Sequence, residues 1–251
     1  MIYITGDCHH NFERFNKSVF LEQEEMTKDD YVIICGDFGG VWHKDAENFE
    51  ETMLLDWLDC KPFTTLFVDG NHENFDRLYN YPVEEWHGGK VHKIRDSVIH
   101  LMRGQVFNLA GRKIFTFGGA SSHDIDDGIL EPDDPQYHVK KRKLDMEGGL
   151  YRINHLSWWA QELPSQEEMQ EGFNNLAANR NKVDFIVSHC CATTTMDLIN
   201  WGMYQPDILT DYFEEIRQCV SFKKWFFGHF HDNVNVSEDE ILLYEQIIRI
   251  A

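Results

Sequence analysis

The chain has 251 residues, with 43 acidic against 23 basic side chains and a formal net charge of −20. A surface this acidic repels long polyanions, which argues against nucleic-acid binding through a basic face. Hydrophobic residues make up 42% and charged residues 26% of the chain, as in soluble globular proteins, and no apolar run is long enough to span a membrane.

The six cysteines are spread along the chain with no CxxC pair and no dense spacing. This pattern favours reduced thiols over a disulfide framework, as expected of a cytoplasmic protein. The apolar run at the N-terminus is shorter than a secretory signal requires. The sequence therefore predicts a cytoplasmic protein, and its length fits one large domain over residues 1–251.

Short apolar runs recur along the chain, and each ends at Gly, Asp, Asn, Ser or His. Such a run is typical of a buried strand followed by a turn. The runs lie at residues 2–4, 31–35, 66–68, 114–117, 185–187 and 225–227. Residues 91–117 hold further β-rich runs. Because helical stretches alternate with these strands, we expect an α/β fold.

The first helical stretch is predicted over residues 46–58. There Phe49, Met53 and Trp57 recur at steps of four and would share one face.

Residues 121–182 differ from the rest of the chain because they are acidic and contain three of the six prolines. Ser165 and Glu168 form a capping-box pattern, which predicts a helix start. Met169, Phe173 and Leu176 follow as an apolar stripe. The basic run at 140–143 is short and flanked by acids, which is typical of a solvated helix face. We expect a cap-like helical insertion at about 121–182 within the single domain.

Five turns that follow apolar strands carry the residues able to do chemistry. In open α/β sheets ligands bind outside the carboxyl ends of the strands, so these turns can converge on one cleft. Asp, Asn and His supply the oxygen and nitrogen donors that borderline divalent metals prefer. The turns are Asp7-x-His9, Gly36-Asp37, Gly70-Asn71-His72-Glu73, Ser188-His189 and Gly228-His229-x-His231.

Taken together and in this order, the five motifs resemble those of the calcineurin-like metallophosphoesterase superfamily. The resemblance implies a four-layer α/β/β/α sandwich and two divalent metal ions, with manganese, iron, zinc or nickel as the candidates. It also implies a role for each donor. Asp7, His9 and His231 would hold one ion, Asn71, His189 and His229 the other, and Asp37 would bridge both. His72 would act as the acid near the leaving group.

These implied roles suit phosphoester hydrolysis. Two cations about 3.5–4 Å apart can share a hydroxide nucleophile and clamp the phosphoryl oxygens. A positioned imidazole such as His72 can protonate the departing oxygen, an effect worth typically about 10²–10⁴ in rate.

The sequence also departs from the family pattern. Gly40 stands where many members carry an Asp that orients the histidine, and Val41 stands where protein Ser/Thr phosphatases carry an Arg. Both differences argue against a protein phosphatase of that type, and His72 needs another partner. Residues 39–42, 118–121 and 151–159 together resemble a bacterial and phage branch of the superfamily. In that branch Arg152 is a candidate phosphate contact, and a surface ion pair is its alternative role.

We therefore expect a metal-dependent hydrolase of a small phosphomonoester or phosphodiester, with His72 and Asp37 as catalytic residues and Asn71, His72 and Arg152 contacting substrate. A binding or scaffold protein with little activity is the alternative, because Gly40 removes an acid that would orient His72. A nuclease is disfavoured by the charge of −20. The sequence does not indicate the oligomeric state.

Overall fold

Two β-sheets face each other in the structure, a computed structural model that describes residues 1–251. The strand order of the first sheet is β15 (Ile248–Arg249), β1 (Ile2–Thr5), β2 (Tyr31–Ile34), β3 (Thr64–Phe67), β6 (Val98–Leu101), β5 (Gly89–Arg95) and β4 (Val83–Trp86). The order of the second is β13 (Val234–Asn235), β14 (Glu240–Leu242), β12 (Lys224–Phe227), β11 (Phe185–Ser188), β8 (Arg112–Phe117) and β7 (Gln105–Leu109).

The central strands of both sheets are parallel, and antiparallel strands close the edges. Every residue of β1, β2, β3, β6 and β11 is buried. The strands expected from the apolar runs are thereby confirmed. Their side chains are apolar at nearly every position because both faces of each sheet are covered.

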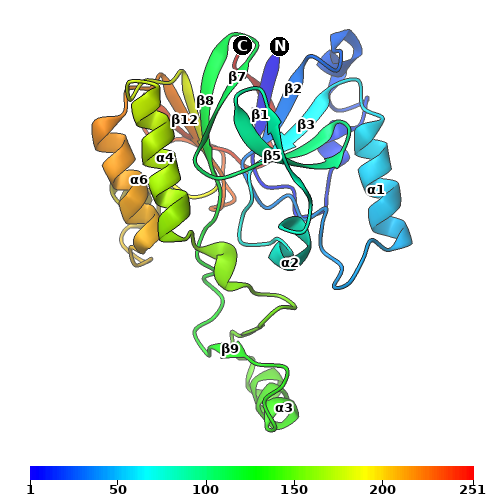
Figure 1. Cartoon of the computed structure of the whole chain (residues 1–251). Helices are drawn as coiled ribbons and strands as arrows, with labels where there is room; N and C mark the ends of the chain where they lie inside the picture. The colour runs from blue at the N-terminus through cyan, green and yellow to red at the C-terminus, as the bar shows by residue number, and fades with distance from the viewer.

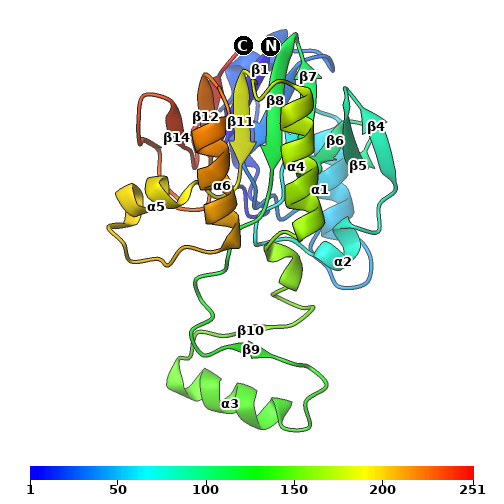
Figure 2. The same ribbon diagram turned by 60° about the vertical axis from the view of Figure 1, so that its left-hand side comes forward.

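Helices cover the outer face of each sheet (Figures 1 and 2). The first sheet carries α1 (Phe49–Asp59) and α2 (Phe75–Leu78), with the 3₁₀ turns η1 (Glu13–Phe15) and η2 (Leu21–Glu25) nearby. The second carries α4 (Gln166–Ala178), α5 (Thr193–Asn200) and α6 (Ile208–Cys219).

Three apolar clusters fill the spaces between these layers. Ile4, Leu66, Ile114 and Val187 belong to the cluster between the two sheets. The other two clusters join the first sheet to α1 and the second sheet to α4 and α6. Three cores between four layers confirm the predicted α/β/β/α sandwich.

The helix predicted at 46–58 forms as α1, but the face expected to be apolar does not pack inward. Phe49 is 79% and Met53 is 55% exposed, whereas Leu55 and Leu58 are fully buried. Glu51 is also buried on that inward face, because Arg77 pairs with its carboxylate at 2.7 Å.

The segment 121–182 has two parts. Residues 121–158, the arm, project from the sandwich and contain β9 (Ile129–Leu130), α3 (Tyr137–Glu147) and β10 (Arg152–Ile153), as both views show. Helix α3 buries no residue, and Lys140 and Lys141 pair with acids of the arm. After the 3₁₀ turn η3 (Ala160–Glu162), α4 begins at the expected capping box and packs on the second sheet. The division into one domain with a cap stays a proposal.

No helix in the structure combines the length and the apolarity that crossing a lipid bilayer requires.

Candidate metal centre

The turns after β1, β2 and β12 bring four side chains together at the carboxyl ends of the strands. Asp7, His9, Asp37 and His231 each offer one donor atom, and these atoms lie within 4.8 Å of one another. His231 Nε2 lies 2.8 Å from His9 Nε2 and 3.2 Å from Asp7 Oδ2. These four residues, far apart in the sequence, form one side of the candidate centre.

The other side of the centre is built around His189, which is fully buried at the end of β11. Its Nδ1–H donates to the carbonyl of Cys35 at 2.8 Å, which fixes the ring with Nε2 directed towards the other donors. Nε2 lies 3.2 Å from Asn71 Oδ1 and 3.4 Å from Asp37 Oδ2. The His229 ring centroid is 5.0 Å from that of His189. Asp37 therefore contacts both sides.

The donor atoms of the centre are carboxylate oxygens, an amide oxygen and imidazole nitrogens, which are the donor types that a divalent cation accepts. Burial alone would lower the pKa of His189, but Asp37 and Asp7 outweigh it and raise the pKa to about 10. Burial likewise opposes ionisation of Asp37, but His189 outweighs it and holds the pKa well below its usual range. The donor set thus fits divalent metal ions.

The backbone of the centre is strained. His9, Asp37, His229 and His231 all have positive φ angles, between 46° and 71°, which non-glycine residues seldom adopt. Each such residue costs of order 1–3 kcal/mol and persists only where the surroundings enforce it. Glycine before the donors allows close packing, because a Cβ at Gly70 would collide with the Asp37 carboxylate. The strained backbone lowers the local stability of these turns but holds the donor side chains in fixed positions.

His72 lies beside the donor cluster, with its ring centroid 4.9 Å from that of His9, and its backbone N–H donates to Asp37 Oδ1 at 2.8 Å. Its partner is Arg152 from β10 of the arm, whose Nη2 donates to His72 Nε2 at 3.1 Å. Burial is the main cause that lowers the pKa of His72 to about 4. Arg152 also donates to Asp124 at 2.7 Å. Arg152 therefore pairs with an acid and also contacts His72, and its contact with a phosphate stays a prediction.

A sequence model of one family, described as calcineurin-like phosphoesterase, matches residues 1–233. The chain belongs to this family. The predicted family resemblance is thereby confirmed, and the family is described as one of phosphoesterases.

Three curated relatives of this calcineurin-like phosphoesterase are lariat debranching enzymes. The identity is 26% with the protein of Xenopus laevis, 24% with that of Danio rerio and 23% with that of Drosophila pseudoobscura pseudoobscura. The matches cover 52%, 55% and 92% of this chain, but only 26%, 27% and 42% of the relatives' lengths. All three relatives are eukaryotic, so the bacterial and phage branch stays a prediction.

Residues without a local sequence signal support the centre of this phosphoesterase. Asn71 Nδ2 donates to Ser122 Oγ at 3.3 Å, which turns the amide oxygen towards His189. The Ser122 N–H in turn donates to Glu162 Oε2 at 3.1 Å. Glu162 is 2% exposed, and burial raises its pKa to about 8. Ser122 and Glu162 lie 51 and 91 positions after Asn71, so no motif spacing could have linked them.

Glu162→Gln should change how stability depends on pH. A raised carboxyl pKa means that the folded protein holds a proton that the unfolded chain has lost, between pH 4.5 and about 8. Folding stability should therefore fall in this window by up to about 1.4 kcal/mol per pH unit because of this group. The variant lacks the effect, so its melting temperature should rise relative to wild type between pH 5 and 8. A constant difference in melting temperature would contradict the assignment.

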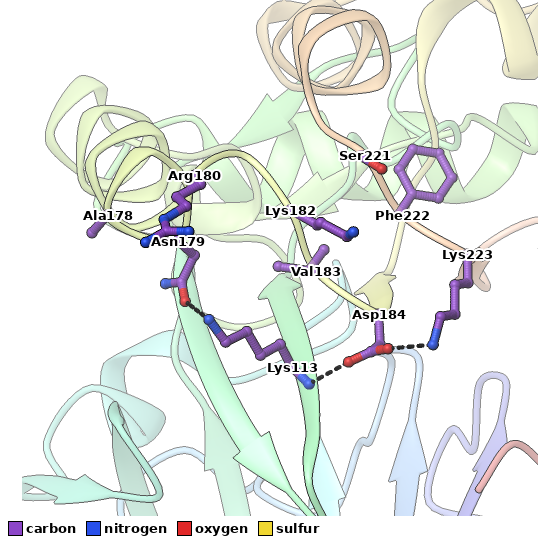
Figure 3. Close-up of a pocket in the computed structure, with 10 residues that line it drawn as sticks. All are labelled: Lys113, Ala178, Asn179, Arg180, Lys182, Val183, Asp184, Ser221, Phe222 and Lys223. Atoms are coloured by element: carbon purple, nitrogen blue, oxygen red, sulfur yellow. Dashed lines mark hydrogen bonds and ion pairs between the residues drawn. The ribbon is translucent and has the colours of Figure 1, made fainter.

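A cavity of about 520 Å³ opens beside the donors of the phosphoesterase and is lined by Asp37, Asn71, His72, Arg152, His229 and His231 together with residues of the arm and of the α5–α6 loop. Nearby, Trp42 packs edge-on against Trp159, with ring centroids 5.8 Å apart, and does not line this cavity. A larger hollow of about 780 Å³ lies where β8, β11 and β12 begin, at the opposite end of the second sheet (Figure 3). Its residues include the ion pair of Lys223 with Asp184 but none of the candidate ligands. The smaller cavity is therefore the candidate substrate site, because it is lined by the candidate metal ligands and the larger hollow is not.

Proposed function

We propose that the chain is a two-metal-dependent hydrolase acting on a phosphoester of a small molecule. In this proposal Asp7, His9 and His231 hold one ion. Asn71, His189 and His229 hold the other ion, and Asp37 is shared by both. The single observation that carries the proposal is the position of Asp37, whose Oδ2 lies 3.6 Å from His9 Nε2 and 3.4 Å from His189 Nε2.

When bound, two divalent ions supply Lewis-acid polarisation of the phosphoryl group and an activated water. Manganese, iron, zinc and nickel all accept this mixture of carboxylate, amide and imidazole donors. The buried carboxylates Asp7 and Asp37, at most 1% exposed, supply the negative charge that attracts the cations.

The chain's own residues act on the substrate from the cavity wall. Arg152 is 8% exposed, and its guanidinium matches phosphate oxygens bidentately. His72 lies between Arg152 and the donors, where a departing oxygen would emerge. The low pKa of His72 means that its ring is neutral before substrate binds. The negative charge of a bound phosphate would favour the protonated ring, which is the form that can donate a proton to the departing oxygen.

His72→Ala should reduce kcat by about 10²–10⁴-fold for phosphoesters with alkyl leaving groups, while the metal content stays at the wild-type value. The loss should be much smaller with 4-nitrophenol as leaving group, because this phenolate departs without a proton. Steady-state rates on both substrate types, with metal analysis of each protein, check the prediction. Equal losses on both types would remove His72 from the acid role.

Purified protein loaded with manganese should release nitrophenol from mono- or bis-aryl phosphates. Absence of turnover with manganese, iron, zinc, nickel and cobalt alike would count against the hydrolase and favour the scaffold alternative. The convergence of all seven donors supports the hydrolase. Metal analysis also distinguishes the hydrolase from the scaffold alternative, because a scaffold protein is expected to contain incomplete or absent metal.

The names of the relatives suggest a branched nucleic acid as a second substrate class. The charge of −20 disfavours it, so the small phosphorylated substrate remains the proposal. Cleavage of a branched oligonucleotide at low salt would support the second class. The proposed cytoplasmic location is supported by the six free cysteines, of which four are buried.

A further inference from the structure

An aromatic wall bounds one flank of the metal-centre cavity. It consists of His123 at the start of the arm, Tyr204 from the α5–α6 loop, and Phe230, which follows His229. The rings of His123 and Tyr204 stack with centroids 3.7 Å apart and planes inclined by 21°. Phe230 lies 6.1 Å from Tyr204 and packs on the core of the second sheet. Because His123 is exposed and lines the cavity, it presents a flat surface next to the donors.

Apolar side chains extend this wall towards solvent. Ile199 near the end of α5, Met203 of the α5–α6 loop and Leu150 of the arm line the same cavity. Met203 is 74% and Leu150 is 48% exposed. Large apolar side chains that are exposed together at a cavity mouth are typical of ligand-binding grooves. This flank is therefore suited to an apolar planar group rather than to another phosphate.

The aromatic wall and His72 lie on different flanks of the donor cluster. The His123 ring centroid is 4.7 Å from that of His229, whereas the His72 ring centroid is 4.9 Å from that of His9. In the proposed function His229 and His9 hold different ions. A group that rests on the wall is thus not the group whose oxygen His72 protonates. Two flanks of one cavity with different chemistry suit two ester substituents on one phosphorus.

We propose that the substrate is a phosphodiester, and that the aromatic wall binds a planar ring on the ester group that does not depart. This inference rests on the proposed function. The oxygen of water forms a bond to phosphorus while the bond from phosphorus to the ester oxygen on the His72 side breaks. That oxygen leaves as an alcohol with the proton from His72, which regains a proton as the water gives one up. The other product is a phosphomonoester whose ring stays on the wall.

The test uses two substrates with the same leaving group, bis(4-nitrophenyl) phosphate and methyl 4-nitrophenyl phosphate. We expect Tyr204→Ala to lower the ratio of their kcat/KM values by about three- to tenfold, as loss of one ring stack implies. The intrinsic reactivities of the two substrates cancel when the ratio is compared between proteins. Tyr204 is chosen because it supports His123 without contacting the metal donors.

Trp201→Asn is the matched control. Trp201 is in the same loop and 90% exposed, does not line the cavity, and has a positive φ of 58° that Asn tolerates. This variant should keep the wild-type ratio.

A binding measurement completes the test without turnover. Calorimetry on the metal-loaded protein should show tighter binding of phenylphosphonate than of methylphosphonate, and Tyr204→Ala should reduce that difference by the same factor. If Tyr204→Ala leaves the kcat/KM ratio unchanged and the two phosphonates bind equally well, the aromatic wall does not bind the ester ring. The proposed hydrolase function would not be affected by that result. Failure of the metal-loaded wild type to hydrolyse either substrate would instead overturn the proposed function, and with it the diester.

Discussion

Asp37→Asn should abolish hydrolysis and metal binding together. The substitution keeps the shape of the side chain and its contact with the His72 N–H, but removes the charge shared by the two sides of the centre. Mutation of a residue that only hydrogen-bonds a metal ligand, without touching the metal, typically costs about 10–100-fold in metal affinity or activity. Because Asp37 is the shared ligand in the proposal, we expect activity to fall by more than this range and both ions to be lost.

The measurement is metal content by mass spectrometry beside kcat/KM on an aryl phosphate. Asp133→Asn is the control, because it makes the same chemical change at an exposed position of the arm. The control should match wild type in both quantities. An Asp37→Asn protein that keeps two ions, or that keeps its activity without them, would contradict the role of Asp37.

Arg103→Met should destabilise the protein by about 3–5 kcal/mol, because it removes the guanidinium that neutralises the buried Asp69 carboxylate and leaves only the contact with His100 Nε2 at 3.1 Å. Asp69 is fully buried, and Arg103 donates to it through Nε at 2.8 Å and through Nη2. Burial would raise the pKa of Asp69, but Arg103 outweighs it and holds the pKa below its usual range. Asp69 directly precedes Gly70 and Asn71, so this pair also anchors the turn that carries a candidate ligand.

Thermal unfolding checks this prediction, and we expect a melting temperature lower by about 10 °C at pH 7. A depressed carboxyl pKa contributes stability above the unfolded pKa, and that stability is lost as the pH falls. The gap between wild type and variant should therefore narrow as the pH falls below the ordinary carboxyl pKa of 3.8. Arg112→Met, which removes an exposed Arg 3.9 Å from Asp184, should change stability by at most about 0.5 kcal/mol. A gap that does not change with pH would assign the loss to packing instead.

Local patterns predicted the strands and the capping box, because the information for these features lies within a few residues. The donors also carried a local signal, since each follows a strand at a turn, and the structure places them close together. The fold followed from the family resemblance of the five motifs rather than from any one of them.

Contacts between distant residues that belong to none of the five motifs could not be predicted. Arg152 reaches His72 from 80 positions away, on an arm whose course no local pattern gives. The prediction of which face of α1 packs inward was wrong, because the buried face includes Glu51, a charged residue that is paired with Arg77. Hydrophobic periodicity alone has no means of recognising a buried ion pair.

Anomalous diffraction from manganese-loaded crystals tests the central claim most directly. We predict two peaks about 3.5–4 Å apart. One peak should contact Asp7, His9 and His231, the other should contact Asn71, His189 and His229, and both should contact Asp37. Crystals that show no peak at Asp37, or manganese only at surface carboxylates, would contradict the two-metal centre and the activity proposed from it.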